Sequence, residues 1–460
     1  MLLPPVYGLS LTTMRPIDHT HNPQLTSWIE SANAPDSDFP IQNLPFCRFQ
    51  PDGGSISIGT GIGSMVLDLA ATADLFSAEL RDAISSRSLK SVMQLPVDQR
   101  IALRHRISEL LSADCPDLRD DAKLREQALL NIDQVQLVIP VQSRDYTDFY
   151  ASVFHATNVG SMFRPNNPLL PNYKHVPIGY HGRASSLVVS GTAVKRPVGQ
   201  LSPAEEGGAP SRGPCKLLDY EMEVGFYVGP GNDLGQTISI ASAEDQIFGT
   251  TLVNDWSARD MQKWEYQPLG PFLAKSFATS VSPWIVTMEA LAPFRCAAFE
   301  RPQGDPRPLN YLSLDSNESH GGIDLQLQVS IVTAAMREQN LPPHQVSSGS
   351  FRDMYWTIAQ MLTHHSSNGC NMQPGDLLAS GTVSNRDRSS RGCLLEMTWD
   401  GDLDNPVPGT QRTAIQFPGG EERKFLADGD SVIMTGFCEN DQYRRIGFGT
   451  CEGTILPVKN

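Results

Sequence analysis

The chain has 460 residues, 40% of them hydrophobic and 19% charged, with a formal net charge of −15, as expected for a globular protein of two or three domains. The acidic balance argues against a nucleic-acid partner, because the sequence offers no basic stripe to follow a phosphate backbone. It does not exclude an anionic substrate, since a cation and a few Arg and Lys side chains can reverse the field inside a cleft.

The N-terminal region predicts an extension followed by strands. Residues 1–36 are rich in Pro, Asn, Thr and Ser, and we expect them to form a poorly ordered extension. Residues 37–75 alternate short apolar runs with turn residues, which is typical of antiparallel strands. The glycine-rich run at 59–63 predicts a hairpin rather than a dinucleotide-binding loop, because Ser64 stands where that fingerprint needs glycine.

Helices are predicted to close this first domain. Residues 95–131 carry apolar side chains at a helical period, and we expect two helices there. Residues 135–141 are rich in β-branched side chains and predict a strand. We therefore expect a small N-terminal β domain with helices over residues 37–140.

Beyond residue 140, short β-like runs separated by glycine- and proline-rich turns dominate the sequence. We expect strands at 187–190, 223–228, 283–287, 325–332, 394–399 and 431–436. We expect helices at about 148–162, 255–265 and 351–365. The fold class is thus mainly β (α+β), with a larger C-terminal domain, residues 141–460, that forms a mixed β-sandwich or roll and carries the active site.

Four acidic residues stand beside apolar or aromatic neighbours rather than in solvated charge runs: Asp148, Glu221, Glu223 and Asp255. A carboxylate is costly to bury alone, so buried ones are paired or bind a metal ion. Glu221 and Glu223 would share one face of a strand, although the solvent face of an edge strand is the alternative. Oxygen ligands of this number suit Ca²⁺ or Mg²⁺ rather than zinc.

His155 is a candidate general base. It lies seven residues after Asp148, and on a helix this spacing would place both side chains on one face. The alternative is a hydrogen-bonded core histidine beside Phe154. Glu396 lies in an apolar run that predicts a strand, which is where an orienting partner for a histidine would be found.

A second group of polar residues follows Asp255. Arg259, Gln262 and Tyr266 continue from it at helical spacing, so the four would form one stripe, functional or merely solvated. Asp255 could also be a plain N-cap.

Lys275 ends the apolar run that begins at Pro268. It is either a surface residue whose stem covers apolar groups or a catalytic cation. Thr279 lies one helical turn further on, and the sequence leaves both interpretations open.

Eight cysteines are present, and none forms Cys-x-x-Cys. We therefore expect free thiols in a reducing cytoplasm and no zinc site. No stretch approaches about 18 consecutive apolar residues, so we expect no membrane span and no membrane partner. The first residues lack a basic start and a continuous apolar core, which argues against a signal peptide.

Seven longer motifs carry a resemblance to a known family. They are Asp-Tyr-Thr-Asp-Phe-Tyr, His-Ala-Thr-Asn-Val-Gly, Gly-Tyr-His-Gly-Arg-Ala-Ser-Ser, Asn-Asp-Trp-Ser-Ala-Arg-Asp, Gly-Pro-Phe-Leu-Ala-Lys-Ser-Phe, Thr-His-His-Ser-x-Asn-Gly-Cys-Asn and Gly-Asp-Leu-Leu-Ala-Ser-Gly-Thr. With these motifs in this order, the chain from Ser37 onward closely resembles the fumarylacetoacetate hydrolase family. The extension before Ser37 is unmatched.

The resemblance implies a metal-dependent hydrolase that cleaves 4-fumarylacetoacetate to fumarate and acetoacetate, the last step of tyrosine and phenylalanine breakdown. It implies a small anionic diketo-acid as substrate, Ca²⁺ and/or Mg²⁺ as cofactor, and a cytoplasmic homodimer. A related acylpyruvate hydrolase, hydratase or decarboxylase is the alternative enzyme, and the N-terminal domain and the His155–Glu396 pair argue against it. A metal-stabilised scaffold without catalysis is the alternative of another class.

The resemblance also implies roles for individual residues. The divalent ion would be held by Asp148, Glu221, Glu223 and Asp255. A neighbouring cation site maps to Lys275 and Thr279, where we expect backbone oxygens rather than the ammonium group as ligands. The base that activates water maps to His155 and its orienting partner to Glu396. The groups that stabilise the oxyanion and the leaving carbanion map to Arg259, Gln262 and Lys275. Substrate contacts map to Tyr150, Arg164, Gln262, Tyr266 and Thr382.

Overall fold

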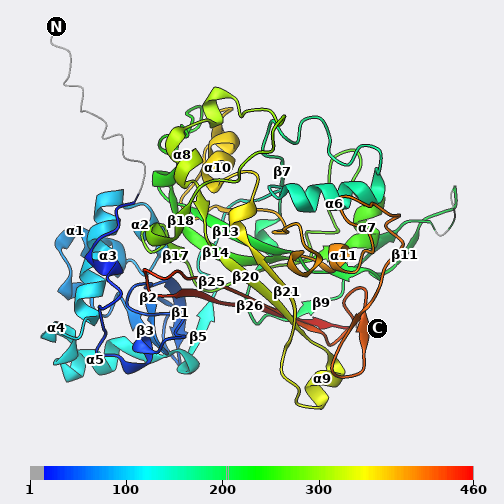
Figure 1. The fold of residues 1–460 in the computed structure, drawn as a ribbon. Coiled ribbons are helices and arrows are strands. Elements are labelled where there is room, and N and C mark those ends of the chain that lie inside the picture. The colour runs from blue at the N-terminus through cyan, green and yellow to red at the C-terminus, as the bar shows by residue number, and fades with distance from the viewer. Residues whose placement is uncertain (1–14, 204, 206, 459–460) are drawn as a thin grey trace, which may run out of the picture.

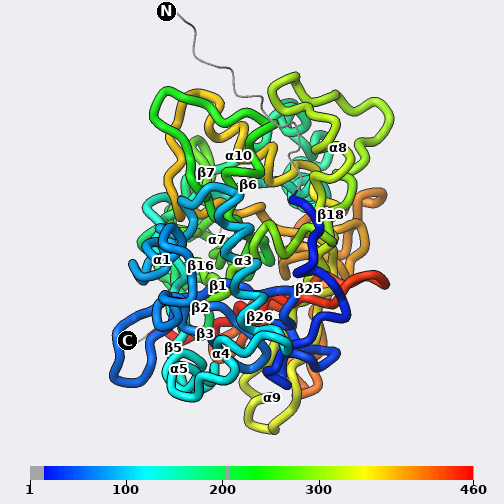
Figure 2. Tube along the Cα trace, turned by 90° about the vertical axis from the view of Figure 1, so that its left-hand side faces the viewer, coloured from blue at the N-terminus to red at the C-terminus, as the bar shows by residue number. Residues whose placement is uncertain are grey.

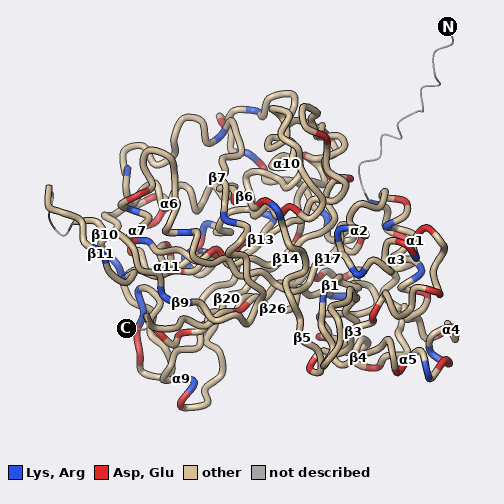
Figure 3. Tube along the Cα trace, turned by 180° about the vertical axis from the view of Figure 1, so that it is seen from behind, with Lys and Arg blue, Asp and Glu red and all other residues tan. Residues whose placement is uncertain are grey.

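The computed structural model describes residues 15–203, 205 and 207–458. A helix-covered β unit from the N-terminal third lies at one end of the molecule, on the left in Figure 1, and Figure 2 looks onto that end. A larger β-rich part makes up the remainder. Lys and Arg segments are interspersed with Asp and Glu segments along the described chain (Figure 3).

The N-terminal sheet is antiparallel, with strand order β4-β3-β2-β1-β5. Its strands are β1 Phe46–Pro51, β2 Ser57–Ile62, β3 Met65–Asp68, β4 Leu129–Asn131 and β5 Val135–Val138. β2 and β3 form a hairpin through Gly63, whose φ of 56° suits glycine. The hairpin predicted for the glycine-rich run is therefore confirmed.

Helices cover this sheet. They are α1 Ala78–Ser85, α2 Leu89–Met93, α3 Val97–Leu111, α4 Pro116–Arg119 and α5 Ala122–Ala128. One face of α3 packs into a core shared with β2 and β3, through Leu103, Ile107 and Leu111. The predicted helical pair becomes three helices, because Pro116 starts a new helix at its first position and Asp121 caps the next by accepting from Leu124 N at 3.0 Å.

The poorly ordered extension predicted for residues 1–36 is wrong over residues 15–36, while residues 1–14 lie outside the described residues. Short 3₁₀ helices form at His19–His21 and Glu30–Asn33. Arg15 is buried, and its Nε lies 3.0 Å from Glu289 Oε1 and its Nη1 2.7 Å from Asp245 Oδ1. These ion pairs join the extension to the C-terminal part, and composition alone could not reveal such distant partners.

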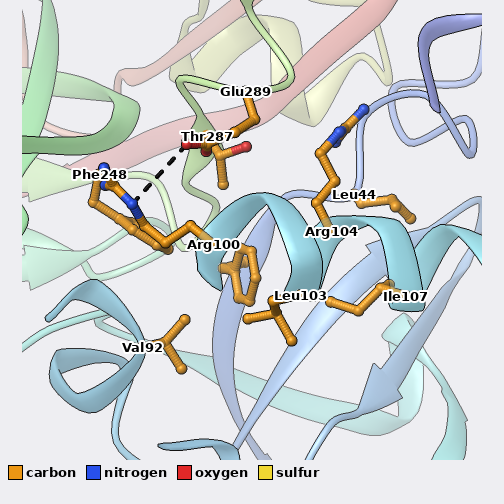
Figure 4. Close-up of a pocket in the computed structure, with 10 residues that line it drawn as sticks. Leu44, Val92, Arg100, Leu103, Arg104, Ile107, Phe248, Thr287 and Glu289 are labelled. Carbon is orange, nitrogen blue, oxygen red and sulfur yellow. Dashed lines mark ion pairs between the residues drawn. The ribbon is translucent and has the colours of Figure 1, made fainter. Parts of the chain in front are cut away.

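α3 makes a second contact with the C-terminal part. Arg100 donates to the carbonyl oxygens of Ile247 at 3.0 Å and Asp245 at 2.8 Å, and its Nε lies 4.0 Å from Glu289 Oε1 (Figure 4). A cavity of about 10 Å³ lies beside Arg100 and Arg104, which is room for about one water molecule. None of the four candidate metal carboxylates lines this cavity, so the functional site lies elsewhere.

The larger part is built on a mixed eight-stranded sheet with the order β7-β6-β22-β13-β14-β16-β8, to which β17 adds by pairing with β14. Its strands are β6 Tyr146–Phe149, β7 Gly179–His181, β8 Leu187–Val189, β13 Met222–Val228, β14 Ile247–Asp255, β16 Thr279–Val281, β17 Val286–Thr287 and β22 Leu377–Ala379. Every residue of β13 and β14 is buried, so these strands form the centre of the core.

A second sheet has the order β21-β20-β25-β26-β9. Its strands are β9 Val194–Lys195, β20 Gln326–Val332, β21 His344–Ser350, β25 Ser431–Cys438 and β26 Ile446–Leu456. Burial alternates along β20 and β25, so one face packs inward. That face joins the core of β13 and β14, and the two sheets form a sandwich (Figure 1).

Helices lie around this sandwich: α6 Val153–Phe163, α7 Arg259–Glu265, α8 Asp315–His320, α9 Ala334–Glu338, α10 Ile358–Ser366 and α11 Leu394–Met397. Short strands complete the part: β10 Val198–Leu201, β11 Ser211–Pro214, β12 Leu218–Asp219, β15 Ser257–Ala258, β18 Arg295–Cys296, β19 Gly322–Ile323, β23 Ile415–Gln416 and β24 Glu422–Arg423. The predicted fold class, a small N-terminal β unit with helices and a larger mixed β part, is confirmed. No helix among the described residues has both the length and the apolar character needed to cross a membrane.

Several predicted elements differ from the structure. The helix predicted at 351–365 starts only at Ile358, after a 3₁₀ helix at Phe351–Asp353, and the strand predicted at 283–287 is confined to Val286–Thr287. The helix predicted at 148–162 starts only at Val153, where Ser152 accepts from His155 N at 3.2 Å as its N-cap. The helix predicted at 255–265 starts at Arg259, because Asp255 still belongs to β14. The run at 394–399 begins as the short helix α11 rather than a strand.

Candidate active site

The four candidate metal carboxylates converge. Asp148 lies on β6, Glu223 on β13 and Asp255 at the end of β14, and Glu221 directly precedes β13. One oxygen of each lies within 4.8 Å of the others, and all four side chains are buried. β13 and β14 are paired neighbours in the central sheet, and β6 joins them through β22. The sheet therefore brings together acidic residues spread over more than a hundred positions.

Part of this cluster lacks protein partners. Asp148 Oδ1 and both carboxylate oxygens of Glu223 are buried without a hydrogen-bond partner among the described residues. Burial raises the pKa of Asp148 and Glu223 well above their ordinary values, and the neighbouring carboxylates raise it further. Such unpaired buried oxygens are costly. The donor set, four carboxylates without sulfur or nitrogen, fits a hard divalent cation.

Two cationic side chains contact the remaining two carboxylates of the cluster. Arg259 Nη1 lies 2.6 Å from Glu221 Oε1, and Lys275 Nζ contacts both Glu221 and Asp255, the latter at 2.8 Å. Although burial acts to raise it, the pKa of Glu221 is lowered by Lys275 and Arg259. Burial acts to lower the pKa of Lys275, but Asp255 and Glu221 raise it above its ordinary value. Lys275 is thus a charged partner of these carboxylates.

The predicted neighbouring cation site gains no direct support. The ammonium group of Lys275 cannot act as a ligand while it is protonated, as the sequence analysis expected. Thr279 Oγ1 donates to Asp255 Oδ1 at 2.7 Å and so holds a candidate ligand in place. A cation site formed by backbone oxygens at Lys275 and Thr279 stays a prediction.

His155 and Glu396 form a buried pair. His155 Nδ1 donates to Glu396 Oε2 at 2.5 Å, and both side chains are enclosed. Glu396 also accepts from Asn158 Nδ2 and from Ser384 Oγ, each at 2.8 Å. Burial acts to raise the pKa of Glu396, but His155 and these hydrogen bonds lower it to about 2. The carboxylate is therefore ionised, and it leaves His155 Nε2 as the nitrogen that can accept a proton.

The secondary structure predicted around these residues was wrong in two places. Asp148 and His155 do not share a helix face, because Asp148 is on β6 and His155 on α6. Glu396 lies on α11 and not on a strand. The residues are nevertheless linked through an ion pair and hydrogen bonds, because Glu221 binds Arg259, Arg259 binds Asp219, and Asp219 accepts from the first N–H group of α11, the helix of Glu396.

Comparison with known proteins decides the family. The model described as fumarylacetoacetate (FAA) hydrolase C-terminal matches residues 145–456, and the one described as fumarylacetoacetase N-terminal matches residues 42–140. The chain belongs to the fumarylacetoacetate hydrolase family. It is 48% identical to the fumarylacetoacetase of Bos taurus over 92% of this chain and 98% of that protein. It is 47% identical to the human fumarylacetoacetase over the same shares of the two chains.

Among solved structures, the chain is similar to a fumarylacetoacetate hydrolase from psychrophilic Exiguobacterium antarcticum. The two share 18% sequence identity, with a TM-score of 0.49 over 90% of this chain and 100% of the other. The family assignment rests on the sequence matches.

Two residues expected to contact substrate in this member of the fumarylacetoacetate hydrolase family have free polar atoms. Arg164 Nε and Thr382 Oγ1 are buried without a hydrogen-bond partner in the described part of the chain. The Tyr150 ring lies 5.3 Å from the His155 ring, and burial raises the pKa of Tyr150. Tyr266 is half-buried at the end of α7, where its N–H donates to Gln262 O at 3.0 Å. Their contact with a substrate stays a prediction.

The predicted stripe from Asp255 to Tyr266 is interrupted. Asp255 ends β14, and only Arg259 and Gln262 lie on α7. These two still meet, because Arg259 Nη1 donates to Gln262 Oε1 at 3.1 Å.

Several further residues at the candidate site were not predicted from the sequence. Tyr180 on β7 donates its hydroxyl to Asp255 Oδ2 at 2.7 Å. Asn158 and Ser384 hold Glu396, and Asp219 accepts from Arg259 Nε at 2.9 Å. Tyr180 and Asn158 lie within motifs that carry the family resemblance, which was the available signal. For Asp219 and Ser384, local sequence gave no sign of a distant partner.

Proposed function

We propose that this chain hydrolyses the carbon–carbon bond of 4-fumarylacetoacetate and gives fumarate and acetoacetate, the last step of tyrosine and phenylalanine breakdown. One observation carries the proposal. Four buried carboxylates, two of them with unpaired oxygens, converge near a His155–Glu396 pair, in a chain that is 48% identical to a named fumarylacetoacetase over 92% of its length.

The cofactor that we propose is Ca²⁺ or Mg²⁺, held by Asp148, Glu221, Glu223 and Asp255. When bound, such an ion supplies Lewis-acid polarisation of a substrate carbonyl group and stabilises developing negative charge. The support in this chain is the oxygen-only donor set and the unpaired oxygens of Asp148 and Glu223.

His155 acts as the general base in this proposal. Its Nε2 takes a proton from water, and the hydroxide oxygen forms a bond to the carbonyl carbon on the fumaryl side. Glu396 holds the Nδ1 proton, fixes the tautomer and stabilises the imidazolium ion that forms. General-base assistance of this kind contributes about 10²–10⁴-fold in rate.

Arg259 and Lys275 stabilise the charge that follows. The carbon–carbon bond then breaks, and its electron pair leaves with acetoacetate as an enolate, which is protonated to give the product. Arg259 Nη2 is buried with no partner among the described residues, so a donor is available for an oxyanion. Gln262, bonded to Arg259, and the Lys275 ammonium group complete this side of the site.

The substrate is a small anionic diketo-acid, and polar groups around the site suit its carboxylates. Arg164 and Thr382 offer the free donors described above, and Tyr150 and Tyr266 offer hydroxyl groups. The enclosed cations explain how a protein with a net charge of −15 could accept an anion.

An acylpyruvate hydrolase, hydratase or decarboxylase is the alternative enzyme. The His155–Glu396 pair supports hydrolysis over decarboxylation, because a histidine held by a carboxylate can take a proton from water. A metal-stabilised scaffold is the alternative outside catalysis. It leaves the unpartnered donors of Arg259 and Thr382 without a role.

We also propose a cytoplasmic location, a homodimer and a domain boundary near residue 140. All eight cysteines are free thiols, which supports a reducing compartment. The boundary is supported by β5, which ends at Val138 and pairs with β1. The homodimer rests on the family resemblance alone.

Product analysis tests the proposed reaction. Purified protein with Mg²⁺ or Ca²⁺ is mixed with fumarylacetoacetate or with an acylpyruvate, the absorbance is followed, and the products are identified by NMR. We expect fumarate and acetoacetate in equal amounts, with a much lower kcat/KM for the acylpyruvate. Preference for the acylpyruvate would support the alternative enzyme. A thermal shift with metal but no turnover of any diketone would support the scaffold.

A further inference from the structure

Asp219 is a buried carboxylate for which the proposed reaction has no direct use. It ends β12, and β12 pairs with β15, the strand that leads into α7. Its side chain is completely enclosed. A carboxylate in such a place has to be matched by donors.

Four N–H donors surround it. Oδ1 accepts from Tyr220 N at 2.9 Å and from Leu394 N at 2.8 Å. Oδ2 accepts from Leu395 N at 2.9 Å and from Arg259 Nε at 2.9 Å. The two oxygens thus join α7, through Arg259, to the first turn of α11.

Both partners of Asp219, Arg259 and α11, lead to groups with a role in the proposed reaction. Arg259 continues from Asp219 to Glu221 Oε1 at 2.6 Å, which is on the metal side of the site. α11 carries Glu396, which holds His155 at 2.5 Å. One carboxylate therefore lies between the oxyanion donor and the base, two groups that must keep a fixed separation around a substrate.

The arrangement of donors leaves little freedom at Asp219. Its backbone is fixed by pairing with Ser257, and the two N–H groups of α11 bind different oxygens. The guanidinium of Arg259 is fixed in turn, because its Nε binds Asp219 and its Nη1 binds Glu221. A change in the length or charge of residue 219 would shift Arg259 and α11 relative to each other.

We propose that Asp219 is a positioning residue that sets Arg259 against the Glu396–His155 pair. The proposal rests on the proposed function, since it assigns Asp219 a part in that reaction. Asp219 touches no reacting atom and acts only through Arg259 and α11. Misplacement of catalytic groups by about 1 Å costs on the order of 10²-fold in rate.

The test compares two substitutions at Asp219 with a matched control. Asp219→Asn keeps the shape but turns an NH₂ group toward two of the four donors. Asp219→Glu keeps the charge but adds a methylene group and changes the spacing. The control is Asp430→Asn, because Asp430 is equally buried and accepts from Arg423 Nε and Ala427 N, each at 2.8 Å, away from the residues of the proposed reaction.

For each variant, kcat and KM for fumarylacetoacetate are measured at saturating metal and expressed per folded molecule, with the melting temperature taken on the same sample. We expect both Asp219 variants to lose about 10²-fold in kcat with KM little changed. Asp430→Asn is expected to lose melting temperature and keep kcat.

Several results would overturn the proposal. They are a folded Asp219→Asn variant with full kcat, a folded Asp219→Glu variant with full kcat, an equal loss of kcat in Asp430→Asn, or failure of both Asp219 variants to fold. The last result would assign Asp219 to the stability of the fold. If the unaltered protein does not hydrolyse fumarylacetoacetate, the proposed function fails, whatever the variants do.

Discussion

The carboxylates at the candidate site fall into two groups. Some have hydrogen-bond partners for their oxygens among the described residues, and others do not. Glu396 has hydrogen bonds to His155, Asn158 and Ser384, whereas both oxygens of Glu223 lack a partner among the described residues. The satisfied carboxylate is suited to a fixed electrostatic role. The open one is suited to an ion. The same residue type is therefore suited to two functions, and its neighbours decide which.

His155→Ala tests the general base. We expect kcat for fumarylacetoacetate to fall below about a hundredth of the unaltered value, because general-base assistance contributes about 10²–10⁴-fold in rate. Metal binding, measured by calorimetry, and the melting temperature are expected to change little. His21→Ala is the control, since His21 is equally buried but its Nε2 lies 2.9 Å from Glu289 O. Retention of more than a hundredth of kcat in folded His155→Ala would contradict the role.

Glu396→Gln tests the orienting partner. The amide keeps the shape but loses the charge that stabilises the imidazolium ion, so kcat should fall far more than KM rises. Steady-state kinetics and thermal unfolding on one preparation measure both properties. A purely structural Glu396 would instead lower the melting temperature and leave kcat per folded molecule unchanged.

At the scale of elements, the central strands hold like charges side by side. β6, β13 and β14 bring Asp148, Glu223 and Asp255 into one cluster, and burial and mutual repulsion raise the pKa of Asp148 and Glu223. Without a cation, these two groups keep protons in the folded state that the unfolded chain releases near pH 4. The folded state then binds more protons than the unfolded state, so its stability falls as pH rises. The lowered pKa of Glu221 contributes a slope of the opposite sign only in acid. The lowered pKa of His21, His364 and His365 contributes such a slope near the ordinary histidine pKa of about 6.5.

We therefore predict that the melting temperature of the chelated protein, relative to that of chelated Glu223→Gln, falls as pH rises above about 4, and that added Mg²⁺ or Ca²⁺ raises it most at the higher pH. Calorimetry in buffers of different ionisation enthalpy should show proton release on metal binding. Glu223→Gln is the control, since it removes one of the raised groups and should flatten the slope. A chelated protein whose melting temperature has the same pH dependence as that of chelated Glu223→Gln would contradict the prediction.

The helices and strands also show which parts of the fold can be predicted from local sequence. Alternation and turn residues predicted β2, β3, β13 and β25, because each strand buries at least one face. They failed at residues 148–152 and 394–399, where partners distant in sequence decide the structure. Asp148 extends β6 because β6 lies between β22 and β7, and α11 starts where Leu394 N and Leu395 N meet Asp219. The candidate site residues were predicted from motifs, whereas their hydrogen-bond partners Asp219 and Ser384 depend on tertiary contacts.

Across the whole molecule, the N-terminal extension ties the two parts together. Arg15 reaches Glu289 and Asp245 in the C-terminal part, and Arg104 of α3 donates to Thr20 Oγ1 at 2.9 Å. Removal of the buried Arg15 guanidinium leaves the Glu289 carboxylate with only one ion pair in the described part of the chain, the longer contact to Arg100 at 4.0 Å.

Arg15→Met should therefore destabilise the protein by about 3 kcal/mol in denaturant unfolding, with kcat unchanged, because Arg15 contacts no residue of the proposed reaction. Arg386→Ala is the control. It removes an ion pair with Asp404 whose side chains are 62% and 71% exposed, and should change stability by less than about 0.5 kcal/mol. Equal changes in the free energy of unfolding for the two substitutions would show that the contacts of Arg15 do not stabilise the fold.

The most direct test of the whole account is turnover of fumarylacetoacetate by chelated protein before and after metal is returned. We predict that chelation removes activity, that Mg²⁺ or Ca²⁺ restores it, and that Glu223→Gln, which loses one of the unpaired carboxylates, is not restored to the same level. Turnover that persists after complete removal of metal, or full recovery by Glu223→Gln, would contradict a reaction that depends on an ion held by these four carboxylates.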